Sequence, residues 1–127
     1  MSIGHEFIRS VLLDHGVRFA EEKRFKELPG YRFDFYATEE CVLFEYDGIQ
    51  HFQAVELFGG NEELAKTRRR DRKKDEWARA NGLPLVRVRF DMPDNEIRSA
   101  ISAALNKRVL GRRTSAHSRR LLKRQRR

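Results

Sequence analysis

Three stretches of the sequence place apolar residues at helical spacing, over about 3–15, 61–81 and 93–107. Asn61 is followed by two acids, and this pattern is typical of the N-cap and first turn of a helix. A glycine follows each of the first two stretches, where glycine typically ends a helix. The sequence therefore predicts three helices, of which the middle one is the longest.

Four shorter stretches have the alternating or continuous apolar residues of β-strands, over 17–25, 31–37, 41–46 and 83–90. Residues 48–60 are expected to form a loop. The predicted order of elements is α-β-β-β-α-β-α, in which three strands follow one another and the fourth is reached through a helix. This order predicts an α/β domain with a mixed sheet flanked by helices, one of them C-terminal.

Basic residues are concentrated in two parts of the chain. The 127 residues carry a net charge of +8, but residues 107–127 contain ten Lys or Arg and no acid, which leaves residues 1–106 with a net charge of −2. Seven of the nine residues over 66–74 are also basic. We therefore expect one domain over 1–107 and a basic, disordered tail over 108–127.

Blocks of positive charge attract a polyanion, and nucleic acid is the most common polyanion inside cells. The alternative is a solvated helix face followed by a tail without a ligand. On the first interpretation, the basic residues expected to contact duplex DNA are Lys66, Arg68, Arg69, Arg70, Arg72 and Lys73 of the predicted helix, and Arg112, Arg113, Arg119, Arg120, Lys123 and Arg124 of the tail.

Several classes of protein are excluded by composition. The sequence has no run of about 18 apolar residues and no basic-then-apolar signal pattern at its start, so we expect neither a membrane span nor secretion. Its single cysteine, Cys41, excludes a disulfide framework and a cysteine-based zinc site. These observations favour a cytoplasmic protein.

Acidic residues lie within two of the predicted strands. Side chains two apart in a strand share a face, so Glu45 and Asp47 point to the same side of the sheet. Asp34 lies on the neighbouring strand, between two phenylalanines. Acids among apolar residues are costly unless they are paired or bind a cation. Carboxylate oxygens are ligands that Mg²⁺ prefers, and the alternative is a set of ion pairs with nearby arginines.

His51 follows the third strand, at the start of the predicted loop. A histidine beside carboxylates can act as a general base or a metal ligand, although an isolated loop histidine is more often simply solvated. On the long predicted helix, Asp71 and Lys74 share a face with Leu64 and Ala78, which we expect to face the sheet. The alternative is an ion pair between Asp71 and Lys74 on a solvated helix.

Together, these segments resemble the PD-(D/E)XK nuclease superfamily. They are most similar to its very-short-patch-repair branch, which includes phage-type homing endonucleases with an E-D-x-H-D active site. The resemblance covers residues 1 to about 92. It depends on the order and spacing of the segments 28–35 (LPGYRFDF), 44–52 (FEYDGIQHF) and 70–75 (RDRKKD), the last continuing to Gly82 and followed by the strand over 85–90. It implies an αβββαβ, restriction-endonuclease-like core.

Carried over by position, the resemblance implies that Asp34 and Glu45 bind Mg²⁺ or Mn²⁺, together with Asp47, which stands where ordinary members have a lysine. His51 matches the catalytic histidine, which would deprotonate the attacking water. Asp71 matches the last aspartate and would orient the histidine or hold metal-bound water.

The resemblance implies two further active-site residues. Lys74 would reach in from the helix to a phosphate. The family's N-terminal glutamate matches less directly, because counting back from Gly16 places His5 at its position whereas the acid is Glu6. We name Glu6 as the candidate, with His5 as the alternative.

The resemblance therefore implies a metal-dependent DNA endonuclease of phage or mobile-element type, in the cytoplasm of a bacterium or of a phage-infected cell. The alternative is a non-catalytic nucleic-acid-binding module that has kept the nuclease fold. Cleavage of RNA, a homodimer and a separate specificity partner all remain open at the level of sequence.

Overall fold

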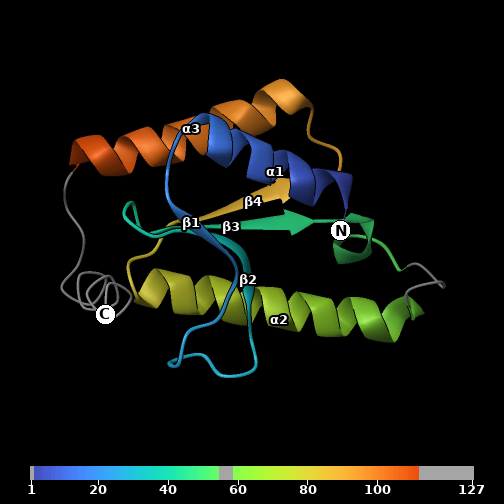
Figure 1. The fold of residues 1–127 in the computed structure, drawn as a ribbon. Helices are drawn as coiled ribbons and strands as arrows, with labels where there is room; N and C mark the ends of the chain where they lie inside the picture. The colour runs from blue at the N-terminus through green and yellow to red at the C-terminus, as the bar shows by residue number, and fades with distance from the viewer. Residues whose placement is uncertain (1, 55–58, 112–127) are drawn as a thin grey trace.

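A mixed four-stranded sheet forms the middle layer of the protein, with helices on both of its faces (Figure 1). The computed structural model describes residues 2–54 and 59–111. Its elements are α1 (Ile3–Asp14), β1 (Phe19–Lys23), β2 (Phe33–Ala37), β3 (Val42–Asp47), the 3-10 helix η1 (Ile49–His51), α2 (Gly60–Ala80), β4 (Leu85–Arg89) and α3 (Asp94–Gly111). The predicted α/β class and the predicted order of the main elements are confirmed.

The strands lie in the order β1-β2-β3-β4, as they do in the sequence. The pairs β1–β2 and β2–β3 are antiparallel, and β3–β4 is parallel. A parallel pair needs a crossover connection, which α2 supplies. Helices α1 and α3 cover one face of the sheet and α2 covers the other (Figure 1). The register of β3 and β4 sets Glu45 opposite Arg87, which matters for the site below.

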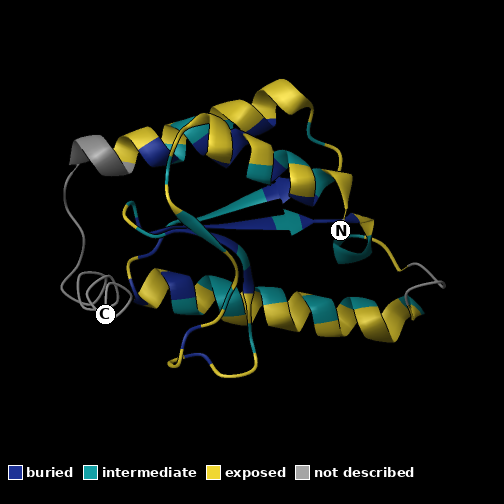
Figure 2. Cartoon of the chain, viewed as in Figure 1, coloured by how far each residue is buried: buried dark blue, intermediate teal, exposed yellow. Residues whose placement is uncertain are grey.

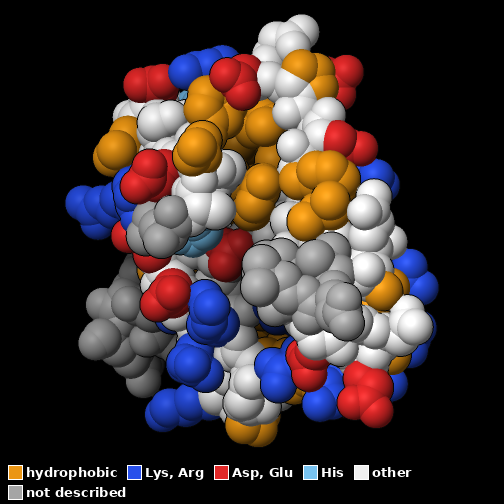
Figure 3. Space-filling model, turned by 90° about the vertical axis from the view of Figure 1, so that its right-hand side faces the viewer, with side chains coloured by type: hydrophobic (Ala, Val, Ile, Leu, Met, Phe, Trp, Pro, Cys, Tyr) orange, Lys and Arg blue, Asp and Glu red, His pale blue; other side chains and the backbone are white. Residues whose placement is uncertain are grey.

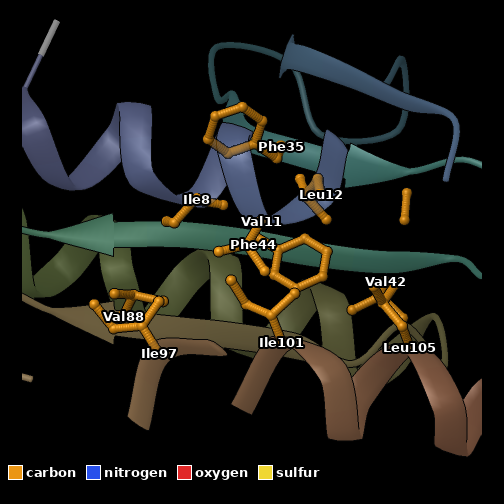
Figure 4. Packing of buried hydrophobic residues seen from close by; sticks show 11 residues of the cluster. Ile8, Val11, Leu12, Phe35, Val42, Phe44, Val88, Ile97, Ile101 and Leu105 are labelled. Carbon is orange, nitrogen blue, oxygen red and sulfur yellow. The ribbon is translucent and has the colours of Figure 1, made fainter. Parts of the chain in front are cut away.

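Each face of the sheet buries its own apolar cluster, because alternate residues of a strand point to opposite faces. In β3, Val42 and Phe44 pack toward α1 and α3 (Figure 4), whereas Leu43 packs on the α2 side with Ala78. Burying a large aliphatic or aromatic side chain contributes about 1.5–3 kcal/mol, so these two clusters fix the sheet between its helices (Figure 2). The same alternation carries Glu45 to the α2 side.

The ends of α2 and α3 differ from the prediction. The N-cap of α2 is Gly59, with a left-handed φ of 93° and no side-chain cap, so the predicted cap at Asn61 is wrong. Glycine adopts this conformation at little cost and starts the helix two residues earlier. Helix α3 continues to Gly111, so four residues that we assigned to the tail are helical.

The predicted loop over 48–60 contains the single turn of η1 directly after β3. The strands are shorter than predicted at most of their ends, because pairing with neighbours and not apolar content sets where a strand stops. No helix within residues 2–54 and 59–111 is both long and apolar enough to cross a membrane.

Candidate active site

The first feature of the site is the point at which β2 and β3 separate. Their pairing ends at Phe35 and Phe44, one residue before the ladder would reach Asp34. There, Oδ2 of Asp34 accepts a hydrogen bond of 2.8 Å from the backbone N–H of Tyr46. The carboxylate thus takes the place of a backbone acceptor and is held in the gap between the strands. This hydrogen bond fixes Asp34 beside the acid of β3.

That acid, Glu45, is buried, with only 5% of its surface exposed. Burial and the neighbouring charge of Asp34 raise its pKa to about 7, although Lys74 acts in the opposite direction. The Nζ atom of Lys74 donates to Oε1 of Glu45 over 2.7 Å. The predicted direction of Lys74, from α2 toward the sheet, is therefore confirmed, and its partner is a strand carboxylate.

A second group of side chains surrounds His51 on η1. Its Nδ1 lies 2.9 Å from Oδ2 of Asp71 on α2 and 3.6 Å from Oδ1 of Asp47 on β3. A carboxylate at Nδ1 favours the tautomer with the proton on that nitrogen, which leaves Nε2 free to accept one. Burial lowers the pKa of His51, but the hydrogen bond and charge of Asp71, with the charge of Asp47, outweigh burial and raise it.

Arg87 on β4 holds this second group together, and the sequence analysis missed it. Its Nη1 lies 2.9 Å from Oδ1 of Asp47 and 3.6 Å from Oδ1 of Asp71. Its Nη2 lies 2.9 Å from Oδ1 of Asp75. The available signal was an arginine at the centre of an apolar strand, on the same face as Leu85, which packs on the α2 side of the sheet. For Asp47, the alternative of an ion pair with an arginine is thus the observed arrangement.

The positive charges of Arg87 and His51 nevertheless do not fully offset the cost of burying the carboxylate of Asp47. It is buried, and burial raises its pKa although the charges of Arg87 and His51 lower it. Asp71 and Lys74 do not form the helix-surface pair considered above, because each has a partner on another element. The long helix therefore delivers Lys74 to the first group, and Asp71 and Asp75 to the second.

A hollow of about 350 Å³ opens over the first group and extends to the second. Its floor includes Asp34, Glu45 and His51, and its rim includes Arg24 and Arg70. A second hollow of about 320 Å³ adjoins it through Asp34. In Figure 3, acidic side chains and a histidine lie near the middle of the face, and Lys and Arg side chains are most frequent below them.

Of the two N-terminal candidates, the structure brings only His5 to the site. His5 is buried in α1, and its Nε2 lies 3.9 Å from Oδ1 of Asp34. Its ring packs on Phe35 with a centroid separation of 4.5 Å. Glu6 is exposed, because adjacent residues of a helix point about 100° apart. His5, the alternative in the sequence analysis, is therefore the better candidate.

The three predicted metal ligands are divided between the two groups. Asp34 and Glu45 lie together in the hollow, whereas Asp47 faces His51 and Arg87. The nearby atoms of Asp47, His51 and Asp71 lie within 4.8 Å of one another, a spacing that allows a metal ion. A cation held there would, however, lie beside the fixed positive charge of Arg87. A cation held by Asp34 and Glu45 would likewise lie beside a positive charge, the ammonium group of Lys74.

The predicted nucleic-acid-binding residues fall into two sets. Those in the tail lie outside the described residues: Arg112, Arg113, Arg119, Arg120, Lys123 and Arg124. Those on α2 are all exposed: Lys66, Arg68, Arg69, Arg70, Arg72 and Lys73. Among the α2 set, Arg70 lines the hollow over the acidic pair.

Comparisons with known proteins add no family assignment. No protein-family model matches the chain, and no curated protein matches it in sequence. The grouping of Asp34, Glu45 and Lys74 thus rests on their positions in the fold.

Proposed function

We propose that the protein is a metal-dependent endonuclease that hydrolyses phosphodiester bonds in DNA. One observation carries this proposal: Asp34 and Glu45 lie side by side on the floor of a hollow with Lys74 bound to Glu45 and arginines at the rim. Acids suit the binding of a divalent cation, and basic groups around them suit a phosphate. A site for hydrolysis of a phosphodiester needs both.

The acidic pair is suited to hold Mg²⁺ or Mn²⁺. Glu45 carries a pKa of about 7 because it is buried and lies beside the charge of Asp34, so two ionised carboxylates at this place are costly without a cation. Oxygen ligands of this kind are those that Mg²⁺ prefers. When bound, the cation would polarise the scissile phosphate and lower the pKa of a coordinated water.

His51 is suited to remove a proton from the attacking water. Its Nδ1 is engaged by Asp71 over 2.9 Å, which leaves Nε2 to accept the proton. Asp47 and Asp71 favour the charged imidazolium that results, and Arg87 holds both carboxylates in place. Asp71 and Arg87 are therefore positioning residues, while His51 and Lys74 are the residues proposed to act on water and phosphate.

The arrangement of elements supports a restriction-endonuclease-like core as part of this proposal. Ordinary members of the PD-(D/E)XK superfamily carry a lysine on the third strand, at the position of Asp47 here. In this chain, Lys74 brings an ammonium group to Glu45 from α2 instead. The position of the lysine in the sequence thus differs from the family pattern, while its positive charge lies beside Glu45, one of the two proposed metal ligands.

The alternative is a nucleic-acid-binding module without activity. The ion pairs of Glu45 with Lys74 and of Asp47 with Arg87 favour it, since they partly neutralise the buried acids without a metal.

An assay of the purified protein on supercoiled plasmid and on an RNA of equal length separates the candidates. We expect nicked or linear DNA with Mg²⁺ or Mn²⁺ and none with EDTA. Binding without cleavage in every metal would establish the module, and cleavage of RNA alone would make the substrate RNA.

A further inference from the structure

Two arginines at the rim of the hollow have no acidic partner within the described residues. The hollow contains four basic side chains, and two of them are paired: Lys74 with Glu45, and Arg32 with Glu22. Arg24 and Arg70 form no ion pair with a carboxylate in residues 2–54 and 59–111. Their positive charge is therefore available to an anion that enters the hollow from outside.

We propose that Arg24, Arg70 and Tyr31 form a binding site for the DNA phosphate next to the one that is cleaved. This proposal deepens the proposed function and rests on it. The three residues come from separate parts of the chain that meet over the acidic floor: Arg24 follows β1, Tyr31 precedes β2, and Arg70 lies in α2. The site therefore belongs to the folded domain and does not depend on the tail.

Tyr31 gives the site a fixed geometry. The guanidinium carbon of Arg70 lies 5.8 Å from the centroid of the Tyr31 ring, within the range of a cation–π interaction. Such a contact restrains a long side chain that would otherwise lose entropy when it binds. A guanidinium offers five N–H donors in a plane, and their fork geometry matches two oxygens of a phosphate. Arg70 is thus restrained before the phosphate arrives.

The direction of α2 supports the choice of Arg70 among the basic residues of the helix. At about 100° per residue, Arg70 lies roughly 40° from Lys74 around the helix axis, whereas Arg69 and Arg72 lie roughly 140° and 160° away. Lys74 points toward the sheet, where it contacts Glu45. Arg69 and Arg72 therefore point away from the hollow, although all three arginines belong to one basic run.

The hollow has negative charge on its floor and positive charge at its rim, so binding of the DNA phosphate at the rim can be measured separately from binding of a cation at the floor. Asp34 and Glu45 repel a phosphate until a divalent cation is bound, whereas Arg24 and Arg70 attract one at any time. DNA is therefore expected to bind through the rim without a divalent cation. A binding measurement in EDTA then reports on the basic residues without the metal site, whether or not the protein cleaves, and a matched pair of variants isolates the share of the rim.

The test compares two double variants of the full chain with equal loss of charge. Arg24→Gln with Arg70→Gln removes the rim arginines, and Arg18→Gln with Arg79→Gln removes two other exposed arginines as a control. The probe is a fluorescent duplex DNA titrated in EDTA at several salt concentrations. Each lost phosphate contact lowers the slope of log affinity against log salt by about 0.9 on duplex DNA. Because both arginines are proposed to contact the same phosphate, we expect a decrease of about one for the rim variant and less than half of that for the control.

Equal slopes for the two double variants would overturn the proposal, because the rim would then act only through net charge. A second pair of variants tests the geometry: Tyr31→Phe keeps the ring beside Arg70 and Tyr31→Leu removes it, and we expect Tyr31→Leu to bind two- to tenfold more weakly than Tyr31→Phe. Equal binding by these two variants would count against the role of the ring. If the slopes differ as expected but no metal supports cleavage, the proposed hydrolysis fails and the phosphate site stands.

Discussion

The Nζ atom of Lys74 lies 2.7 Å from Oε1 of Glu45 and joins helix α2 to strand β3. This contact brings a positive charge to the acidic pair from the opposite layer of the fold. Because the ammonium group is within hydrogen-bonding distance of a proposed metal ligand, Lys74 is well placed to contact the same phosphate as the cation. The contact therefore connects the packing of α2 to the proposed chemistry.

Metal binding is expected to depend on pH through Glu45. Burial and the charge of Asp34 raise the pKa of Glu45 to about 7, above its ordinary value of 4.5. The cation binds the ionised form, so affinity for Mn²⁺ should increase as pH rises through 7, and binding at pH 6.5 should release a proton. Calorimetry in two buffers with different ionisation enthalpies measures this release. The Glu45→Gln variant provides the control, and proton release of the same size in that variant would exclude Glu45 as its source.

His51→Ala should reduce cleavage about 10²- to 10⁴-fold near neutral pH, the usual contribution of a positioned base. Binding of DNA in Ca²⁺ should persist, because a base contributes little to affinity for the substrate.

The pKa of His51 is raised, so wild-type activity should increase with pH through a value above 6.5. In Asp71→Asn, which removes the hydrogen-bonded charge, that limb of the pH profile should shift to lower pH. A profile unchanged in Asp71→Asn would show that His51 is not the titrating group.

Arg87→Ala should destabilise the fold strongly. It leaves Asp47 buried without its nearest cation, and breaking one side of a buried ion pair costs about 3–5 kcal/mol. The matched control is Arg98→Ala, which removes the exposed pair with Asp14 and should cost no more than about 1 kcal/mol. Urea denaturation of both variants measures the difference. Equal stabilities would mean that the Arg87 network contributes no more than a surface ion pair.

Strand alternation made one half of the candidate site predictable from the sequence. Leu43 and Glu45 had to share a face because they are two residues apart in β3. The spacing of Asp71 and Lys74 from Ala78 likewise fixed the direction of both charges on α2. These predictions depended only on local geometry, which the sequence specifies directly.

The other half depended on contacts between elements. The role of Arg87 follows from the parallel register of β3 and β4, which no local pattern specifies. The separation of β2 from β3 at Asp34 depends on a side chain taking the hydrogen bond of Tyr46. For these reasons, the sequence grouped Asp47 with Asp34 and Glu45, whereas the structure turns it toward His51.

The tail is expected to add affinity for DNA without contributing to catalysis. Deleting residues 112–127 removes eight basic residues and leaves every described element in place. If half of these residues contact phosphate, the slope of log affinity against log salt should decrease by roughly four. Cleavage at saturating DNA and low salt should be retained. An unchanged salt slope would assign the tail to another partner.

The central claim is that Asp34 and Glu45 form the metal site of a nuclease, and cleavage by variants of these two acids tests it most directly. Asp34→Asn, Glu45→Gln and the control Glu76→Gln, an exposed acid of α2, are purified in parallel and assayed on supercoiled plasmid with Mg²⁺ or Mn²⁺. Loss of a metal ligand usually costs orders of magnitude in rate. We predict that the first two variants lose cleavage, keep or increase their metal-free melting temperature, and contrast with an active control. Cleavage at the wild-type rate by both Asp34→Asn and Glu45→Gln would contradict the metal-site assignment.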